Sequence, residues 1–199
     1  MSCPVVGQLL KNVYGCRVVG SAGSADKVAL LRDLGFDAAW NHKEVPIRPV
    51  TPPIPVLGKA LAEHCPDGID IYFENVGGET LEAVLDAANT LARIVACGMI
   101  SQYDLAPEER YGVKNLFNII GKQIKLQGFI VSTLAKGMEA EFAAEMAQHV
   151  LDGKVKVIEH RTVGLEKIGA AFRELFVGAN VGKAVVQVAE RDPFPVASK

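Results

Sequence analysis

Short apolar runs alternate with segments of helical periodicity along this chain of 199 residues. Each run has the length of a buried strand, about four to eight residues. The predicted strands lie at 16–20, 36–41, 69–74, 93–98, 124–131, 157–163 and 184–188. The predicted helices lie at 4–14, 60–65, 115–120, 134–151 and 166–176, with two more after Ser24 and after Gly78. This alternation predicts an α/β fold with a doubly wound parallel sheet.

The composition is that of an ordinary globular protein, with 49% hydrophobic and 22% charged residues. A net charge of −2 gives no basic surface for nucleic acid or an anionic membrane. No apolar run approaches the roughly 18 residues that span a bilayer, and the first residues show no signal peptide. The scattered cysteines and histidines form neither a disulfide framework nor a metal-binding spacing, so we expect a cytoplasmic protein without a metal. They are Cys3, Cys16, Cys65, Cys97, His42, His64, His149 and His160.

Two segments stand out by composition or pattern. The stretch 45–57 holds five prolines in thirteen positions, which excludes a helix or a central strand and predicts an extended surface loop. Within 134–151, apolar residues recur at every fourth position, and this stripe predicts a helix face buried in the core. The stripe consists of Leu134, Met138, Phe142, Met146 and Val150.

The first candidate binding site is the segment 20–27, GSAGSADK, where a predicted strand ends and a helix begins. Ser24 suits the N-cap of that helix. In dinucleotide folds this strand end meets the adenosine ribose, and an acidic residue there selects NAD. No acid ends this strand, and Lys27, one turn into the helix, is placed to pair with a 2′-phosphate, as is the helix N-terminus. A capped helix with a solvated lysine is the alternative interpretation.

Two further candidates also follow strands. At 75–78, NVGG, glycines let the backbone approach a ligand closely, and the next helix points its N-terminus there. A strand-to-helix turn that needs glycine only for its geometry is the alternative. The segment 128–131, GFIV, is a candidate contact as well, although it also fits a core strand.

The fourth candidate is Tyr103, at the end of the segment 93–103, RIVACGMISQY. A short apolar run ends at Gly98, and a polar loop follows. In open α/β sheets ligands bind just outside the carboxyl ends of the strands, so Tyr103 is a candidate hydrogen-bond donor near a binding crevice. A tyrosine that only packs at the rim is the alternative.

Four segments, GSAGSADKVALL, DGIDIYFENVGG, RIVACGMISQY and QGFIVS, together resemble the zinc-independent medium-chain dehydrogenase/reductase superfamily. The most similar branch contains the plant double-bond reductases and alkenal reductases, with the mammalian prostaglandin reductases as cousins. The resemblance implies a Rossmann-like domain and NADPH-dependent reduction of the C=C bond of an α,β-unsaturated aldehyde or ketone. It places Tyr103 on the active-site tyrosine, as donor or proton source, and Lys27 on the residue that meets the 2′-phosphate.

The resemblance also implies the set of cofactor contacts. These are Ser24, Lys27, His42, Asn75, Cys97, Gly98, Ser101, Tyr103, Phe129, Ile130, Val131 and Asn180. His42 stands where the family has a tyrosine near the adenosine. Relatives pair through the last strand of the cofactor sheet, which corresponds to 124–131 and implies a homodimer.

The family pattern extends beyond the residues of this sequence. It includes an N-terminal barrel-like domain, a first Rossmann strand and a glycine-rich turn, so we expect a Rossmann-like domain at 1–155 that lacks them. Residues 156–199 correspond to a segment that packs with the barrel-like domain in the family. Two other functions stay open: a non-catalytic nucleotide-fold protein, and a quinone reductase of the same superfamily, against which the sequence ISQY at Tyr103 argues.

Overall fold

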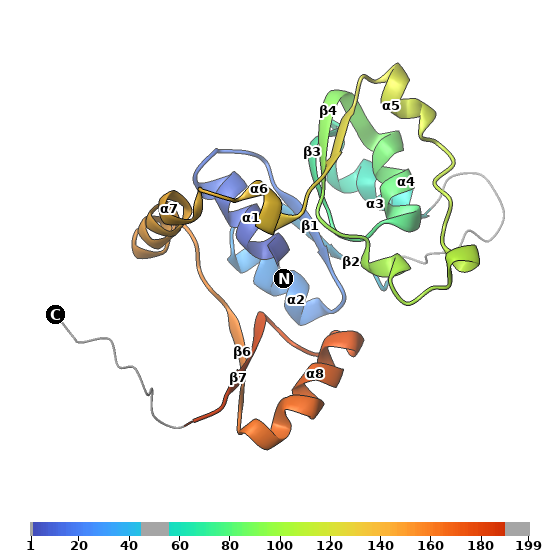
Figure 1. The fold of residues 1–199 in the computed structure, drawn as a ribbon. Helices are drawn as coiled ribbons and strands as arrows, with labels where there is room; N and C mark the ends of the chain where they lie inside the picture. The colour runs from blue at the N-terminus through green and yellow to red at the C-terminus, as the bar shows by residue number, and fades with distance from the viewer. Residues whose placement is uncertain (1, 45–55, 190–199) are drawn as a thin grey trace.

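The computed structural model describes residues 2–44 and 56–189 (Figure 1). The strands are β1 (Val19–Ala22), β2 (Ala38–Asn41), β3 (Ile69–Glu74), β4 (Ala88–Ala96), β5 (Lys125–Gly128), β6 (Glu159–Val163) and β7 (Lys183–Gln187). The α-helices are α1 (Ser2–Asn12), α2 (Ala25–Asp33), α3 (Val56–His64), α4 (Gly78–Ala87), α5 (Phe117–Gly121), α6 (Val131–Leu134), α7 (Glu139–Leu151) and α8 (Ile168–Val177). The loop predicted at 45–57 lies outside the described residues except for its last two positions, where α3 begins.

Every strand pair is parallel, so the predicted parallel α/β fold is confirmed. β1 pairs with β2, β3 to β5 form a second sheet in sequence order, and β6 pairs with β7. Within the described residues no strand pairs with β1 or β3 on their second edges. In the doubly wound order 3-2-1-4-5-6 the first strand lies between these two edges. The described residues therefore form separate sheets, and β1 and β3 each keep one unpaired edge.

Each of the first two sheets has its own hydrophobic core. The core of β1, β2 and α2 consists of Val18, Val28, Leu31, Leu34, Phe36 and Ala39. The core of β3, β4, α3 and α4 consists of Leu61, Leu81, Ala83, Val84, Leu85, Ala88, Ala92, Ile94 and Ile124. Trp40 of β2 packs against this second core and stacks on His64 of α3, with 5.3 Å between ring centroids. This stack links the two bodies across the break in the sheet.

Local sequence signals fix the first helices. Ser24 is the N-cap of α2, as predicted, and its Oγ accepts a hydrogen bond from the Lys27 backbone N–H at 3.4 Å. Gly35 closes the same helix with a φ of 93°, a left-handed value that favours glycine. In α1, Gly7 lies directly against the ring of Phe36, because a Cβ at this position would stand 2.1 Å from the ring.

Several predicted boundaries are wrong, among them those of three strands. The strand predicted at 16–20 is β1, which begins only at Val19. The strand predicted at 124–131 ends at Gly128 as β5, and Val131 begins α6. The strand predicted at 93–98 is β4, which begins already at Ala88 and ends at Ala96. Periodicity indicates that a strand is present, but it does not separate the end of a strand from the end of a helix.

The helix predicted at 134–151 is two helices, and its apolar stripe is not part of the core. Gly137, with a φ of 85°, lies between α6 and α7. Met138 and Phe142 are 52% and 62% exposed, and Met146 is only partly buried. The prediction of a buried stripe is therefore wrong. The helical period shows that a face is apolar, but it does not show what covers that face.

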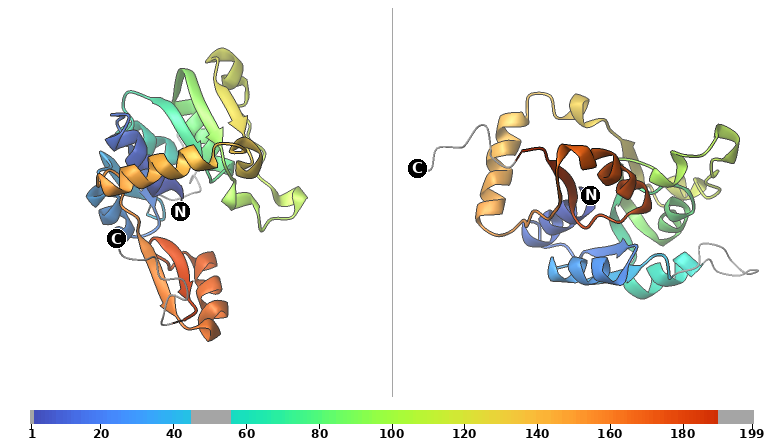
Figure 2. Two further views of the ribbon diagram at one scale, coloured as in Figure 1. Left: turned by 60° about the vertical axis from the view of Figure 1, so that its left-hand side comes forward. Right: turned by 90° about the horizontal axis from the view of Figure 1, so that it is seen from below.

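The buried side chain of Gln8 fastens the end of the α7 region to α1. Its Nε2 donates to the Lys156 carbonyl at 3.1 Å, and its Oε1 accepts from the Lys156 N–H at 2.7 Å. Asn12 Nδ2 adds a bond of 2.7 Å to the Lys154 carbonyl. Beyond this anchor, β6, α8 and β7 form a separate unit that projects from the other sheets (Figure 2). The predicted domain boundary between residues 155 and 156 falls at this anchor and stays a prediction.

Candidate active site

The loop 97–103 after β4 is fastened to the turn 75–78 after β3. Backbone N–H groups of the loop donate to carbonyls of the turn region at 2.9–3.1 Å. The pairs are Cys97 to Glu74, Gly98 to Glu74, Ile100 to Asn75 and Ser101 to Val76. The loop also lies close against Gly77, where a Cβ would stand 2.8 Å from the Cβ of Met99. Gly77 has a φ of 74°, so glycine serves both the turn and this close approach.

Glu74 organises this turn, and it was missed in the sequence analysis. Its side chain is fully buried at the end of β3. Its Oε1 accepts hydrogen bonds from the N–H groups of Val76 and Gly77, the latter at 2.9 Å, and from the Tyr72 hydroxyl at 3.2 Å. An acidic residue at the end of an apolar strand, just before a glycine pair, is the signal that could have identified it.

Tyr103 lies at the rim of the site, on the far side of the loop from β5. Its hydroxyl accepts a hydrogen bond from the Met99 N–H at 2.9 Å, and the residue is 59% exposed. A Cβ on Gly98 would stand 2.7 Å from that hydroxyl oxygen. The glycine that ends the predicted strand therefore makes room for the tyrosine. Since the hydroxyl acts as acceptor here, it keeps its own hydrogen for donation to a ligand.

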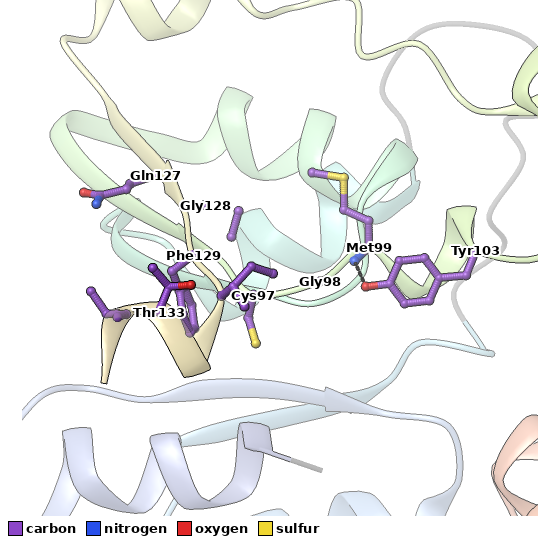
Figure 3. A pocket seen from close by; sticks show the side chains of 11 residues that line it. Cys97, Gly98, Met99, Tyr103, Gln127, Gly128, Phe129 and Thr133 are labelled. Atoms are coloured by element: carbon purple, nitrogen blue, oxygen red, sulfur yellow. Dashed lines mark hydrogen bonds between the residues drawn. The ribbon is translucent and has the colours of Figure 1, made fainter. Parts of the chain in front are cut away.

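A hollow of about 710 Å³ opens between the ends of β4 and β5 (Figure 3). It is lined by Ala96, Cys97, Gly98, Met99, Tyr103, Gln127, Gly128, Phe129, Ile130, Thr133 and Leu134. Figure 3 shows Tyr103 at one end and Gln127 and Thr133 at the other, with Cys97 between them. The structure thus brings together most of the candidates predicted at the ends of these strands. Val131 begins α6 and is exposed next to the hollow, outside its lining.

A second group of candidates lies at the ends of β1 and β2. Ser24 caps α2, Lys27 lies in its first turn, and His42 follows β2. His42 is close to Gly23, where a Cβ would stand 3.3 Å from its Nε2. Burial lowers the pKa of His42, and the positive charges of Lys43 and Lys27 lower it further. The imidazole is consequently neutral at pH 7.

Asn180 lies in the turn between α8 and β7, and this turn contacts the second group through another residue. Its Nδ2 donates to the Gly182 carbonyl at 2.9 Å. Two residues earlier, the Gly178 carbonyl accepts a hydrogen bond from Lys27 Nζ. The candidate residues therefore form two groups, both at carboxyl ends of parallel strands, where ligands bind in α/β folds.

Residues 5–151 match a family model described as zinc-binding dehydrogenase. The chain belongs to this family. The 2-alkenal reductase (NADP⁺-dependent) of Nicotiana tabacum is 45% identical over 185 residues, which are 92% of this chain and 50% of that protein. Prostaglandin reductase 1 of Mus musculus is 41% identical over 183 residues, 92% of this chain and 52% of that one. The predicted branch of the medium-chain dehydrogenase/reductase superfamily is confirmed.

Solved structures of family members agree with the fold. CurA from Vibrio vulnificus in complex with NADPH superposes with a TM-score of 0.81 at 40% identity, over 94% of this chain and 54% of that one. The chain spans about half the length of the relatives it matches. Despite the family's name, the described residues contain no group of three or more His, Cys, Asp or Glu side chains that could hold a metal ion. In the same part of the chain, no helix is long and apolar enough to cross a membrane.

Proposed function

We propose that this chain is the cofactor-binding part of an NADPH-dependent reductase of the C=C bond in α,β-unsaturated aldehydes and ketones. The observation that carries the proposal is the position of Tyr103 at the rim of the hollow, with its hydroxyl oriented by the Met99 N–H. Two relatives support the substrate class: the 2-alkenal reductase of Nicotiana tabacum, and the (+)-pulegone reductase of Mentha piperita, which is 44% identical over 92% of this chain.

The residues present fit a phosphorylated dinucleotide. The end of β1 carries no acidic side chain, and Lys27 and the N-terminus of α2 offer a positive charge and N–H groups there. The hollow beside Cys97 and Phe129 has the size of a ligand site. The neutral imidazole of His42 is suited to pack beside an adenosine. NADPH, when bound, supplies the hydride that is added to the β-carbon of the substrate.

Tyr103 supplies the hydrogen-bond donor that the reaction needs at the substrate carbonyl. A donor aimed at the substrate carbonyl oxygen stabilises the negative charge that develops there when the β-carbon accepts hydride. The Met99 N–H bonds the phenol oxygen on one side, which leaves its O–H for the substrate. The α-carbon then gains a proton, and the C=C bond becomes a C–C single bond. The tyrosine thus acts as the catalytic donor or proton source.

The Tyr103→Phe variant tests this role. We expect kcat to fall by about 10²- to 10⁴-fold, while the NADPH affinity changes much less. The assay follows NADPH oxidation with an enal, in the chain joined to the N-terminal half of the tobacco 2-alkenal reductase. An unchanged kcat would show that Tyr103 only packs at the rim.

A dinucleotide-binding protein without turnover is the second candidate function. The unpaired edges that β1 and β3 have among the described residues favour it. Titration of the purified chain with NADPH, followed by addition of an enal, separates the two functions. Binding without NADPH oxidation supports the second candidate.

The outer edge of β5 is the proposed contact with a second copy. Within the described residues β5 pairs only with β4, and an unpaired strand edge is a template for another strand. Ile130 and Leu134, which follow the strand, are largely exposed next to it. A homodimer is expected from light scattering at micromolar concentration, and a monomer there would contradict this contact.

A further inference from the structure

The C-terminal end of α8 is closed by a side chain from a distant element. The helix ends at Gly178, which adopts the left-handed conformation with a φ of 64°. The Ala179 N–H bonds back to the Glu174 carbonyl at 3.0 Å. No basic residue lies in the last turn of α8 itself. Instead the ammonium of Lys27, in the first turn of α2, donates a hydrogen bond to the Gly178 carbonyl.

This bond joins two parts of the chain that are separated by 151 positions in the sequence. In Figure 1 the end of α8 and the turn to β7 lie next to α2. The exposed carbonyls at a helix C-terminus carry a partial negative charge, which attracts a cation. The contact therefore has an electrostatic reason and holds a long, flexible side chain in one place.

We propose that the C-terminal end of α8 positions Lys27 for a 2′-phosphate, so that the turn 178–182 determines cofactor specificity. The inference rests on the proposed NADPH-dependent function. Gly178 is a positioning residue here, since it acts through Lys27.

The Gly178 carbonyl can position the Lys27 ammonium without competing with a phosphate for it. A lysine ammonium has three N–H donors, and the Gly178 carbonyl uses one of them. The remaining donors stay available for phosphate oxygens, which form the stronger, charge-assisted bonds. A lysine side chain loses rotamer freedom when it binds a phosphate, and a side chain that is already held loses less. His42 lies near enough for the charge of Lys27 to lower its pKa, which places the adenosine side of the site beside the same ammonium.

The test compares two fragments that differ only in the 2′-phosphate, adenosine 2′,5′-bisphosphate and 5′-AMP, by titration calorimetry on the full chain. We expect the wild-type chain to bind the bisphosphate about tenfold to a hundredfold more tightly, the range of one charged hydrogen bond. Lys27→Ala should abolish this ratio. Gly178→Ala should lower it at least threefold, because alanine is strained at a φ of 64° and the carbonyl must move. Its Cβ would stand 4.0 Å from Lys27 Nζ, so it causes no clash.

Gly178→Asn is the matched control, since asparagine tolerates the left-handed conformation, and it should keep the wild-type ratio. In the Lys27→Ala background, Gly178→Ala should cause no further change, because the two residues act on the same phosphate. Hydrogen exchange of the wild-type chain provides a readout that needs no variant. The bisphosphate should slow exchange at the Gly178 and Ala179 amides more than 5′-AMP does.

The inference would be overturned by a bisphosphate preference that survives Gly178→Ala unchanged, or by equal exchange of the two amides with both fragments. Equal affinities of the wild-type chain for the two fragments would overturn it as well. These outcomes are independent of the proposed reaction. A positioned Lys27 in a chain that never oxidises NADPH with an enal supports the inference and counts against the reductase. Enal reduction by a chain whose bisphosphate preference is unchanged by Gly178→Ala supports the reductase and counts against the inference.

Discussion

Two units of this chain have the same order of strand, helix and strand, but their helices differ in how far they are buried. In β3–α4–β4 and in β6–α8–β7, a ten-residue amphipathic helix connects two parallel strands. In the first unit Leu81 and Leu85 of α4 are buried. In the second, Phe172 and Phe176 of α8 are 59% and 68% exposed, and their rings contact each other edge to face at 5.2 Å between centroids.

The difference in burial comes from the elements that pack against each helix and not from the helices themselves. Leu61 of α3 packs into the same core as α4, and Ile124 closes that core near β5. In the described chain the only buried residue of α8 is Ala171, next to its own strands. An amphipathic pattern therefore predicts a helix and its apolar face, while the burial of that face depends on segments far away in the sequence. Substitutions should separate the two units by their effect on stability.

The largest difference is expected between Leu85→Ala and Phe172→Ala. Leu85 is fully buried, so its truncation leaves a cavity and should lower the free energy of unfolding by about 2–5 kcal/mol. Phe172 is mostly exposed, and its truncation should change that free energy by less than about 0.5 kcal/mol. Urea unfolding at 25 °C measures both. A comparable loss in Phe172→Ala would break the comparison, because α8 would then be covered in solution.

Two glycine-to-alanine substitutions should sharpen the comparison, because they should change the free energy of unfolding in opposite directions. Gly7→Ala pushes a Cβ into the Phe36 ring, a buried member of the first core, and should destabilise by about 1–3 kcal/mol. Gly169→Ala in α8 meets no atom within 4 Å and should stabilise by about 0.4–1 kcal/mol through its helix propensity. Thermal melts of the two variants provide the measurement. The same sign in both would show that α8 is packed as tightly as α1.

The sequence predicted the features that depend on neighbouring residues. The N-cap Ser24 and the parallel α/β order follow from local composition and alternation. The polar loop before Tyr103 was also predicted, although β4 ends at Ala96 and Gly98 lies within the loop and not at the end of the strand. The roles of these residues in catalysis and cofactor binding stay predictions.

The sequence did not predict the features that depend on distant contacts. The contact of Lys27 with Gly178 joins segments that no local pattern relates. Glu74 reads as one more charged residue at a strand end until its hydrogen bonds with the following turn are seen. The stripe with Phe142 reads as core because its period is helical, and only the three-dimensional arrangement shows it exposed.

The smallest effect concerns Asp37, which ties α1 to β1 within the packed part of the molecule. Its Oδ1 accepts a hydrogen bond from Lys11 Nζ at 2.6 Å, and its Oδ2 accepts one from the Val18 N–H at 2.8 Å. The bond from Lys11 and then that from Val18 lower the pKa of Asp37 below its ordinary value of 3.8. The folded state therefore favours the ionised carboxylate, and this stability is present above pH 4 and lost as the pH falls through the lowered pKa.

At pH 7 we expect Asp37→Asn to lower the free energy of unfolding by about 0.5–1 kcal/mol, a small value because water screens this partly exposed pair. The difference from wild type should shrink below pH 4, where the wild-type carboxylate takes up its proton, and also in 1 M salt. Asp152→Asn is the matched control. Asp152 also has a lowered pKa, chiefly through its bond from Gln148, but both residues belong to the end of α7, outside both cores, so its substitution should change the stability and its pH dependence less than Asp37→Asn does. Urea unfolding between pH 2.5 and 7 tests both variants. Equal pH dependence in the two would mean that the tie between α1 and β1 contributes no more than a surface contact, and that the packed body is held by its apolar core alone.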